Sequence, residues 1–192
     1  EMANAYATIA NGGYRNTPTA ITKVVFRDGK VDELDSTKRK KVFSDGVTAK
    51  ATDILEQNIQ AGTGTAANIG CPAAGKTGTT DDFRDAWFVG YTPKLTTAVW
   101  VGYPNEQTSM YSVHGIAVAG GTFPAQIWGA YMKQAKGKYC GDFPAPKEPF
   151  KSTPFFGKYA TTGAPGDEVT TDETGATDFE TGGTKPKKKP DG

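Results

Sequence analysis

Two short apolar runs, DAWFVGY at residues 85–91 and LTTAVWVGY at residues 95–103, stand almost end to end in the middle of this chain. Both are rich in aromatic and β-branched residues, which is typical of strands. Only Thr92, Pro93 and Lys94 separate them, so the connection is tight and favours antiparallel pairing. The chain is therefore expected to build its fold around an antiparallel sheet.

Helices are predicted on both sides of these runs. Small and apolar residues recur at helical spacing in residues 1–11, and Gly12-Gly13 ends the pattern. A second helix is expected in VTAKATDILEQNIQ and a third in TFPAQIWGAYMKQAKG, with Thr122 as the cap of the third and Pro124 in its first turn. The residues expected to share one face of the second and third helices are Val47, Ala51, Ile54, Leu55 and Ile59, and Phe123, Ile127, Tyr131 and Gln134.

A hairpin is predicted between the first two helices. The run ITKVVFRDGKVDEL has β-branched residues on both sides of an Asp28-Gly29 turn. The expected order is thus helix, hairpin, helix, three strands and helix, the first of the three strands being AGKTGTT. Consecutive strands flanked by helices indicate an α+β fold rather than alternating βαβ units.

The last forty residues differ in kind from the rest. Thr, Gly and Pro make up about half of residues 152–192, acidic residues cluster from Asp167 to Glu180, and KPKKKP follows. Such a composition buries too little apolar area to offset the entropy of ordering, so residues 151–192 are predicted to be a disordered tail. Residues 1–150 are expected to form the folded part.

Composition excludes several classes of function. A net charge of +1 gives no electrostatic case for a nucleic-acid partner, and no run of about 18 apolar residues is present to cross a membrane. The single histidine, His114, leaves no Ser-His-Asp triad and little metal chemistry, so no metal or other cofactor is expected. Because EMANAYATIANGG begins without a leader, as if inside a helix, we expect the numbering to open within a larger protein.

The stretch GCPAAGKTGTT, residues 70–80, has two interpretations. It satisfies G-x-x-x-x-G-K-[ST], the loop that holds nucleotide phosphates, but that loop requires a buried strand before it and a helix after it. AGTGTAANIG is a poor strand and TGTTDDFRD a poor helix start, which argues against a nucleotide site. As a strand, the stretch places Lys76 between two glycines and beside the Thr77 and Thr79 hydroxyls, which suits the carboxylate of an extended peptide. A threonine-rich edge strand without a ligand is the remaining alternative.

The neighbouring segments extend the strand interpretation. EMANAYATIANGG, DILEQNIQAGTGTAA, PAAGKTGTTDDFRDAWFVGYTP, TTAVWVGY and GGTFPAQIW, in this order, closely resemble the C-terminal half of the transpeptidase domain of bifunctional, class A penicillin-binding proteins. The resemblance implies part of the serine β-lactamase and penicillin-binding transpeptidase fold. It also implies a serine acyltransferase that cross-links peptidoglycan stem peptides ending in D-Ala-D-Ala and is trapped by β-lactams.

The resemblance assigns roles to four residues of one motif. Lys76 would supply a positive field and assist proton transfer, and the Thr77 and Thr79 hydroxyls would hold the substrate carboxylate, with Gly78 between them. The Thr79 N–H would be one oxyanion donor, an interaction whose loss often costs about 100-fold in rate. Asp85, Trp87 and Phe88 would belong to the strand packed behind the site.

The serine motifs of the family are missing from this sequence. Neither S-x-x-K, which carries the nucleophile, nor S-x-N begins at any serine, these being Ser36, Ser44, Ser109, Ser112 and Ser152. In the family both motifs precede EMANAYATIANGG, as do the glycosyltransferase domain and the membrane anchor. The chain alone is therefore expected to be inactive, to need the N-terminal half of the domain as its partner, and to work on the extracytoplasmic face of a bacterial membrane.

The resemblance also places both cysteines outside the cytoplasm, where disulfides persist. A bond between Cys71 and Cys140 would close a long loop, worth about 4 kcal/mol by the chain-entropy relation. Two separate buried thiols are the alternative. Three other functions stay open beside the transpeptidase: a D,D-carboxypeptidase or β-lactamase of the same superfamily, a nucleotide-binding protein, and a non-catalytic peptide-binding module.

Overall fold

The computed structural model describes residues 1–34 and 38–152. The two central apolar runs are strands β6 (Asp85–Tyr91) and β7 (Thr96–Gly102), and β5 (Ala74–Thr79) precedes them. They form one antiparallel sheet in the order β5-β6-β7, with Thr77 opposite Phe88 and Phe88 opposite Val99. The predicted antiparallel pair is confirmed. The Thr92 hydroxyl closes its turn by accepting hydrogen bonds from the N–H groups of Lys94 and Leu95.

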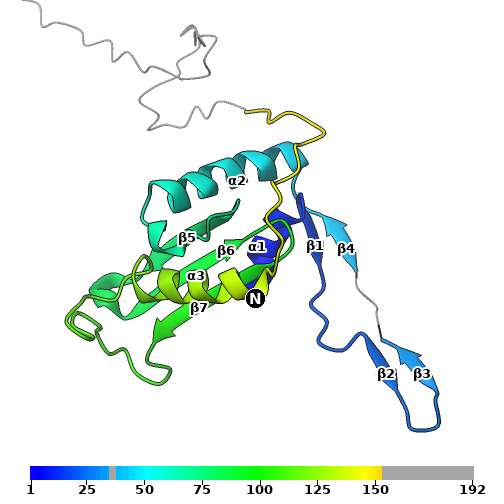
Figure 1. The fold of residues 1–192 in the computed structure, drawn as a ribbon, viewed down its shortest axis with the longest axis horizontal. Coiled ribbons are helices and arrows are strands. Elements are labelled where there is room, and N and C mark those ends of the chain that lie inside the picture. The colour runs from blue at the N-terminus through cyan, green and yellow to red at the C-terminus, as the bar shows by residue number, and fades with distance from the viewer. Residues whose placement is uncertain (35–37, 153–192) are drawn as a thin grey trace, which may run out of the picture. The chain divides into compact units, whose positions relative to one another are not determined.

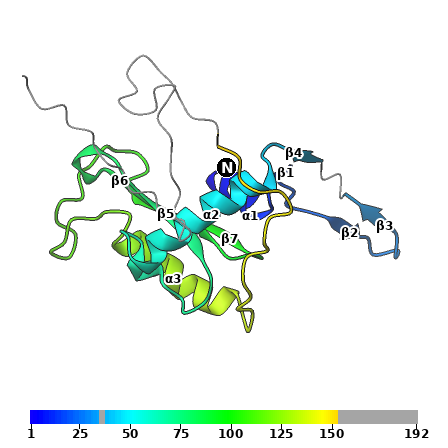
Figure 2. The ribbon, with the colours of Figure 1, turned by 90° about the horizontal axis from the view of Figure 1, so that it is seen from above.

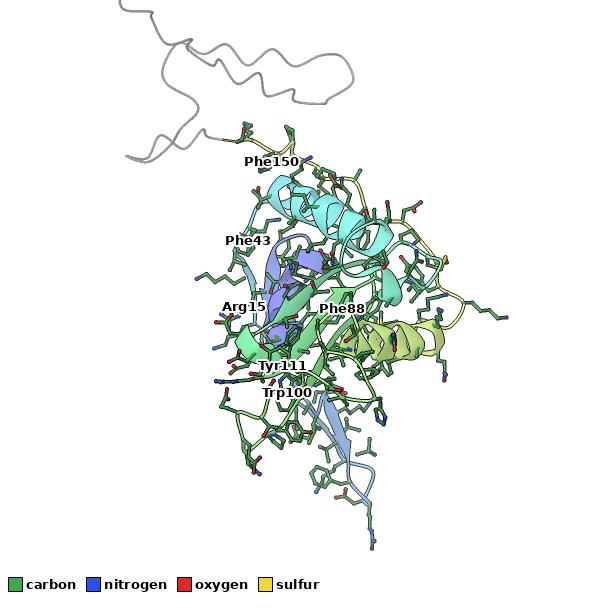
Figure 3. The ribbon with its side chains drawn as sticks, turned by 90° about the vertical axis from the view of Figure 1, so that its left-hand side faces the viewer. Arg15, Phe43, Phe88, Trp100, Tyr111 and Phe150 are labelled. Carbon is green, nitrogen blue, oxygen red and sulfur yellow. A yellow bond between two sulfur atoms is a disulfide. The ribbon has the colours of Figure 1, made fainter. Side chains whose placement is uncertain are left out.

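Helices cover both faces of this sheet. Helix α1 (Met2–Ala10) and helix α3 (Phe123–Ala135) lie on opposite faces, and α2 (Asp45–Gln60) lies beside β5 (Figure 1). Phe88 lies in the interior, whereas Arg15, Phe43 and Phe150 lie at the periphery (Figure 3). The arrangement is the expected α+β class, with antiparallel strands flanked by helices.

Helix α3 packs with a different face from the one expected. Pro124, Ala125, Trp128, Gly129 and Met132 are buried, whereas Ile127 is 49% and Tyr131 52% exposed. The Trp128 ring meets that of Phe88 at 5.3 Å between centroids, and its N–H reaches the carbonyls of Gly90 and Thr97. The large indole decides the packed face, since no other side chain of the helix buries so much apolar area. Thr122 stands at the cap position but exchanges its hydrogen bonds with Ala119 instead of capping the helix.

Helix α2 also turns a partly different face inward. Its buried residues are Gly46, Thr48, Thr52 and Ile59, while Val47 and Ile54 are exposed. The threonine hydroxyls donate hydrogen bonds to backbone carbonyls of the preceding turn, and Thr52 donates to the Thr48 carbonyl at 2.8 Å. Thr52 then accepts a hydrogen bond from the Tyr91 hydroxyl at 2.9 Å, and burial raises the pKa of Tyr91 to about 12. Polar residues thus occupy this face because each has a partner.

Two small ribbons join α1 to α2. The predicted hairpin is β2 (Lys23–Val25) paired with β3 (Val31–Glu33), and its turn residue Gly29 has a φ of +80°. The hairpin extends away from the three-stranded sheet in both Figure 1 and Figure 2. Strands β1 (Tyr14–Asn16) and β4 (Arg39–Lys41) also pair, although each is too short to show a sequence pattern. Two 3-10 turns, η1 (Thr65–Ala67) and η2 (Asp81–Phe83), flank β5.

A disulfide joins Cys71, just before β5, to Cys140, just after α3, across a sequence separation of 69 residues. Their Cα atoms are 5.2 Å apart, and Cys71 packs against the core cluster that contains Phe88 and Trp128. The bond ties the end of α3 to the entrance of β5.

We expect reduction of this disulfide to lower the free energy of unfolding by about 4 kcal/mol, because the reduced chain regains the entropy of a long loop. Urea unfolding with and without reductant measures the difference. The double variant Cys71→Ser with Cys140→Ser serves as the control and should not respond to reductant. Equal stability of the oxidised and reduced chains would contradict the prediction.

Within the described residues, no helix combines the length and apolar character needed to cross a membrane. The predicted disordered tail lies outside the described residues, apart from Lys151 and Ser152, and the boundary at residue 150 stays a prediction.

Candidate active site

Strand β5 is an edge strand in the described part of the chain, and its backbone alternates between two directions. The Thr80 N–H bonds the Asp85 carbonyl at 3.0 Å, which makes residues 80 and 85 a hydrogen-bonded pair. Such pairs alternate in antiparallel sheets, so Lys76 and Gly78 turn their backbone groups toward β6. Gly75, Thr77 and Thr79 therefore present their N–H and C=O groups at the free edge.

Helix α2 closes one end of this free edge. The Asn58 side-chain amide donates to the Gly75 carbonyl at 2.8 Å. The edge beyond it, at Thr77 and Thr79, is open, and the exposed Lys76 ammonium bonds the Thr77 carbonyl at 2.9 Å. An open edge beside a fixed positive charge is suited to an extended chain that carries a carboxylate.

Each threonine hydroxyl at this edge has one partner. The oxygen atoms of the Thr63 and Thr77 hydroxyls are 2.7 Å apart, and Thr63 also donates to the Asn58 carbonyl oxygen at 3.0 Å. The Thr79 hydroxyl accepts a hydrogen bond from the Gly120 N–H at 3.0 Å. The loops that precede β5 and α3 therefore hold the two side chains in place.

The glycines around β5 make room for protein groups. A Cβ on Gly75 would lie 2.7 Å from the Phe88 ring, so this glycine accommodates an aromatic core residue and not a ligand. A Cβ on Gly120 would lie 2.3 Å from the Trp87 carbonyl and 2.7 Å from the Gly78 N atom. The loop that contains Gly120 thus lies directly against the Gly78–Trp87 pair, and close approach to Gly78 comes from the chain itself.

A strained turn follows Thr79. Asp82 and Phe83 have φ values of 58° and 54°. This backbone conformation is unfavourable for residues other than glycine, and it persists only when neighbouring residues hold it. Ser109 donates to the Asp82 carbonyl at 2.6 Å, and Tyr111 donates to the Asp82 carboxylate at 3.2 Å, which raises the pKa of Tyr111. These contacts fix the β5–β6 connection at the Thr79 end of the open edge.

The sequence predicted that the four motif residues share one strand, and β5 contains all of them: Lys76, Thr77, Gly78 and Thr79. The neighbouring strand β6 contains Asp85, Trp87 and Phe88, also as predicted. The lysine lies inside β5, which only the three-residue turn η2 separates from β6, so the strand-to-helix geometry of a phosphate loop is absent here. His114 is exposed in a loop with a φ of 50°. Among residues 1–34 and 38–152, no three His, Cys, Asp or Glu side chains are grouped to hold a metal ion.

Sequence reasoning missed Asn58, Thr63 and Gly120. The signal that could have found Thr63 is its position between Gly62 and Gly64, because glycine on both sides of a polar residue indicates close packing of its backbone. Nothing local to Asn58 distinguishes it from an exposed helix residue.

Residues 1–127 match the family described as "Penicillin binding protein transpeptidase domain". Together with the antiparallel sheet and its lysine-bearing edge strand, this match defines the class: the chain belongs to the penicillin-binding protein transpeptidase family.

Individual relatives agree with the family match. The chain is 36% identical over 160 residues to penicillin-binding protein 1A of Mycobacterium tuberculosis and 37% identical over 150 residues to that of Aquifex aeolicus, in each case over 77% of this chain. The alignments cover 19% and 20% of these relatives, so the chain spans about a fifth of their length.

Solved structures show the same fold. The penicillin-binding protein PonA1 from Mycobacterium tuberculosis matches with a TM-score of 0.69 and 33% identity, over 80% of this chain and 44% of that one. The structure of PonA1 in complex with penicillin V matches with a TM-score of 0.68 and 35% identity, over 77% of this chain and 40% of that one.

Proposed function

We propose that this chain supplies the substrate-binding edge strand of a peptidoglycan D,D-transpeptidase. The observation that carries the proposal is the open edge of β5 at Thr77 and Thr79, with the exposed Lys76 ammonium beside it. The terminal D-Ala-D-Ala of a stem peptide would lie along this edge as an added strand, and a β-lactam would take the same place. The PonA1 complex with penicillin V is the relative that supports β-lactam binding.

The proposal gives each residue of the motif a role. The Thr79 N–H at the free edge would donate to the oxyanion of the tetrahedral intermediate. The Thr77 and Thr79 hydroxyls would donate to the ligand carboxylate, and Lys76 would lower the energy of negative charge at the reacting centre. The Gly78 backbone lies close to Gly120, where a Cβ would come within 2.7 Å of the Gly78 N atom.

The nucleophile must come from outside these 192 residues, because none of the five serines begins S-x-x-K. We use "assembled transpeptidase" for this chain combined with the segments that carry S-x-x-K and S-x-N. Strand β7 is the other edge of the sheet in the described residues, and in this proposal those segments pair with its outer backbone groups. In this proposal the enzyme works on the extracytoplasmic side of a bacterial membrane, anchored by other parts of the protein.

Fluorescent penicillin tests the proposal. In the assembled transpeptidase the label should appear on the segment that carries S-x-x-K, while this chain alone should take none. Label on this chain alone would show a nucleophile other than the proposed one, and an assembled enzyme that takes no label would overturn the proposal. Product analysis with and without an acceptor amine separates transpeptidation from hydrolysis by a carboxypeptidase or β-lactamase.

A further inference from the structure

A short hydrogen-bond relay runs from the core of the molecule to the open edge of β5. It begins at the Gly75 carbonyl, passes through the Asn58 amide and the Thr63 hydroxyl, and ends at the Thr77 hydroxyl. Asn58 is half-buried and Thr63 is exposed, so the relay ends at the surface where the ligand is proposed to bind.

Donor and acceptor requirements fix the direction of the relay in the empty site. A carbonyl only accepts, so the Asn58 group that faces Gly75 must be its NH₂, and its oxygen faces Thr63. That oxygen also only accepts, so Thr63 donates its one proton to Asn58. Thr63 then has only lone pairs for Thr77, and the Thr77 hydroxyl donates to Thr63.

Close packing of the chain holds the relay in position. A Cβ on Gly62 or on Gly64 would lie 2.7 Å or 2.8 Å from the two polar atoms of the Asn58 amide, and both glycine N–H groups bond the Asn58 backbone carbonyl at 3.1 Å. A Cβ on Gly121 would lie 2.3 Å from the Thr63 carbonyl. The backbone on both sides of Thr63 is therefore packed closely against Asn58, and the Thr63 carbonyl is packed closely against Gly121.

We propose that Thr63 is a positioning residue for the ligand carboxylate, a role that deepens the proposed function and rests on it. In the empty site Thr63 accepts the Thr77 proton and keeps the Thr77 hydroxyl at the strand edge. When a carboxylate binds, Thr77 turns its proton to the ligand, and Thr63 turns its own proton to the Thr77 oxygen. The Asn58 oxygen then bonds water, which its half-exposed position allows.

The reversed relay strengthens the bond to the ligand, because a hydroxyl that accepts a hydrogen bond is a better donor. Thr79 needs no such partner, since its oxygen already accepts from the Gly120 N–H, which leaves its proton to donate to the ligand. Loss of the Thr63 hydroxyl should therefore weaken recognition of the carboxylate and leave recognition of the rest of the ligand unchanged.

The test is the Thr63→Val variant of the assembled transpeptidase, which keeps the β-branched shape and removes the hydroxyl. Stopped-flow acylation is measured with a penicillin and with its methyl ester, which lacks the carboxylate charge. With the penicillin, the dissociation constant of the non-covalent complex should rise about fivefold, as expected for one hydrogen bond, and the rate constant of acylation should stay within about twofold. With the ester, neither constant should change.

Two further variants serve as controls. Thr63→Ser restores the hydroxyl and should restore penicillin binding. Thr65→Val makes the same change at an exposed threonine two residues further on, the first residue of η1, and should behave as the wild type. An equal effect of Thr63→Val on penicillin and ester, or no effect on either, would overturn the inference while the proposed function stands. A wild-type enzyme that penicillin does not acylate at all would contradict both the inference and the proposed function.

Discussion

Replacing Lys76 with methionine is expected to lower the rate constant for acylation of the assembled transpeptidase by penicillin by about 100-fold or more. Methionine keeps an unbranched apolar stem and removes the ammonium that lies at the free edge of β5, 2.9 Å from the Thr77 carbonyl. The charge acts where negative charge develops, so its loss should raise the barrier of the chemical step more than it weakens binding. Time courses with fluorescent penicillin at several concentrations separate the two constants.

Lys133→Met is the matched control, because Lys133 is an exposed lysine on α3, outside β5. It should leave both constants unchanged. Lys76→Arg keeps the positive charge but spreads it over a planar group, so partial activity is expected. A Lys76→Met enzyme that is acylated as fast as the wild type would remove Lys76 from the proposed site.

Replacing Trp128 with alanine is expected to lower the free energy of unfolding by about 5 kcal/mol, at the upper end of large-to-small changes in a core. Trp128 is fully buried, makes an edge-to-face contact with the Phe88 ring, and donates hydrogen bonds to the carbonyls of Gly90 and Thr97. The variant would lose the indole's apolar contacts, leave a cavity between α3 and the sheet, and leave the two carbonyls without this donor. Urea unfolding followed by far-UV circular dichroism measures the loss.

Tyr131→Ala is the control for this change, because Tyr131 is an aromatic residue of the same helix and is 52% exposed. Its effect should stay below about 1 kcal/mol, as is usual for surface positions. Equal losses from the two variants would contradict the packing described here, in which Trp128 is buried and Tyr131 is exposed.

The two apolar runs determined most of what could be predicted about the fold. Each run carries its own evidence, since its β-branched and aromatic residues favour strands and the three residues between the runs favour antiparallel pairing. The Asp28-Gly29 turn likewise encodes its hairpin locally, through a glycine with positive φ. The residues of the motif could be predicted together because they are adjacent in sequence on one strand.

The packed faces of the helices could not be predicted in the same way. In α3 the spacing of Phe123, Ile127 and Tyr131 suggested one face, and the structure buries the face of Trp128. In α2 the buried positions include Thr48 and Thr52. These residues are polar, but they can be buried because their hydroxyls donate hydrogen bonds to backbone carbonyls of the helix. Which face is buried depends on packing partners in other elements, and the sequence of one helix does not identify those partners.

The sequence by itself therefore determined the class of the fold, the order of the central elements and the lysine-bearing strand, because these depend on residues close together in the chain. Only the tertiary structure decided that Asn58 closes one end of the strand edge, that Thr63 reaches Thr77, and that Gly120 reaches Thr79. These contacts join residues up to 41 positions apart. A hydrogen bond between residues far apart in the chain forms only after packing has brought their backbones together, so no local sequence pattern predicts it.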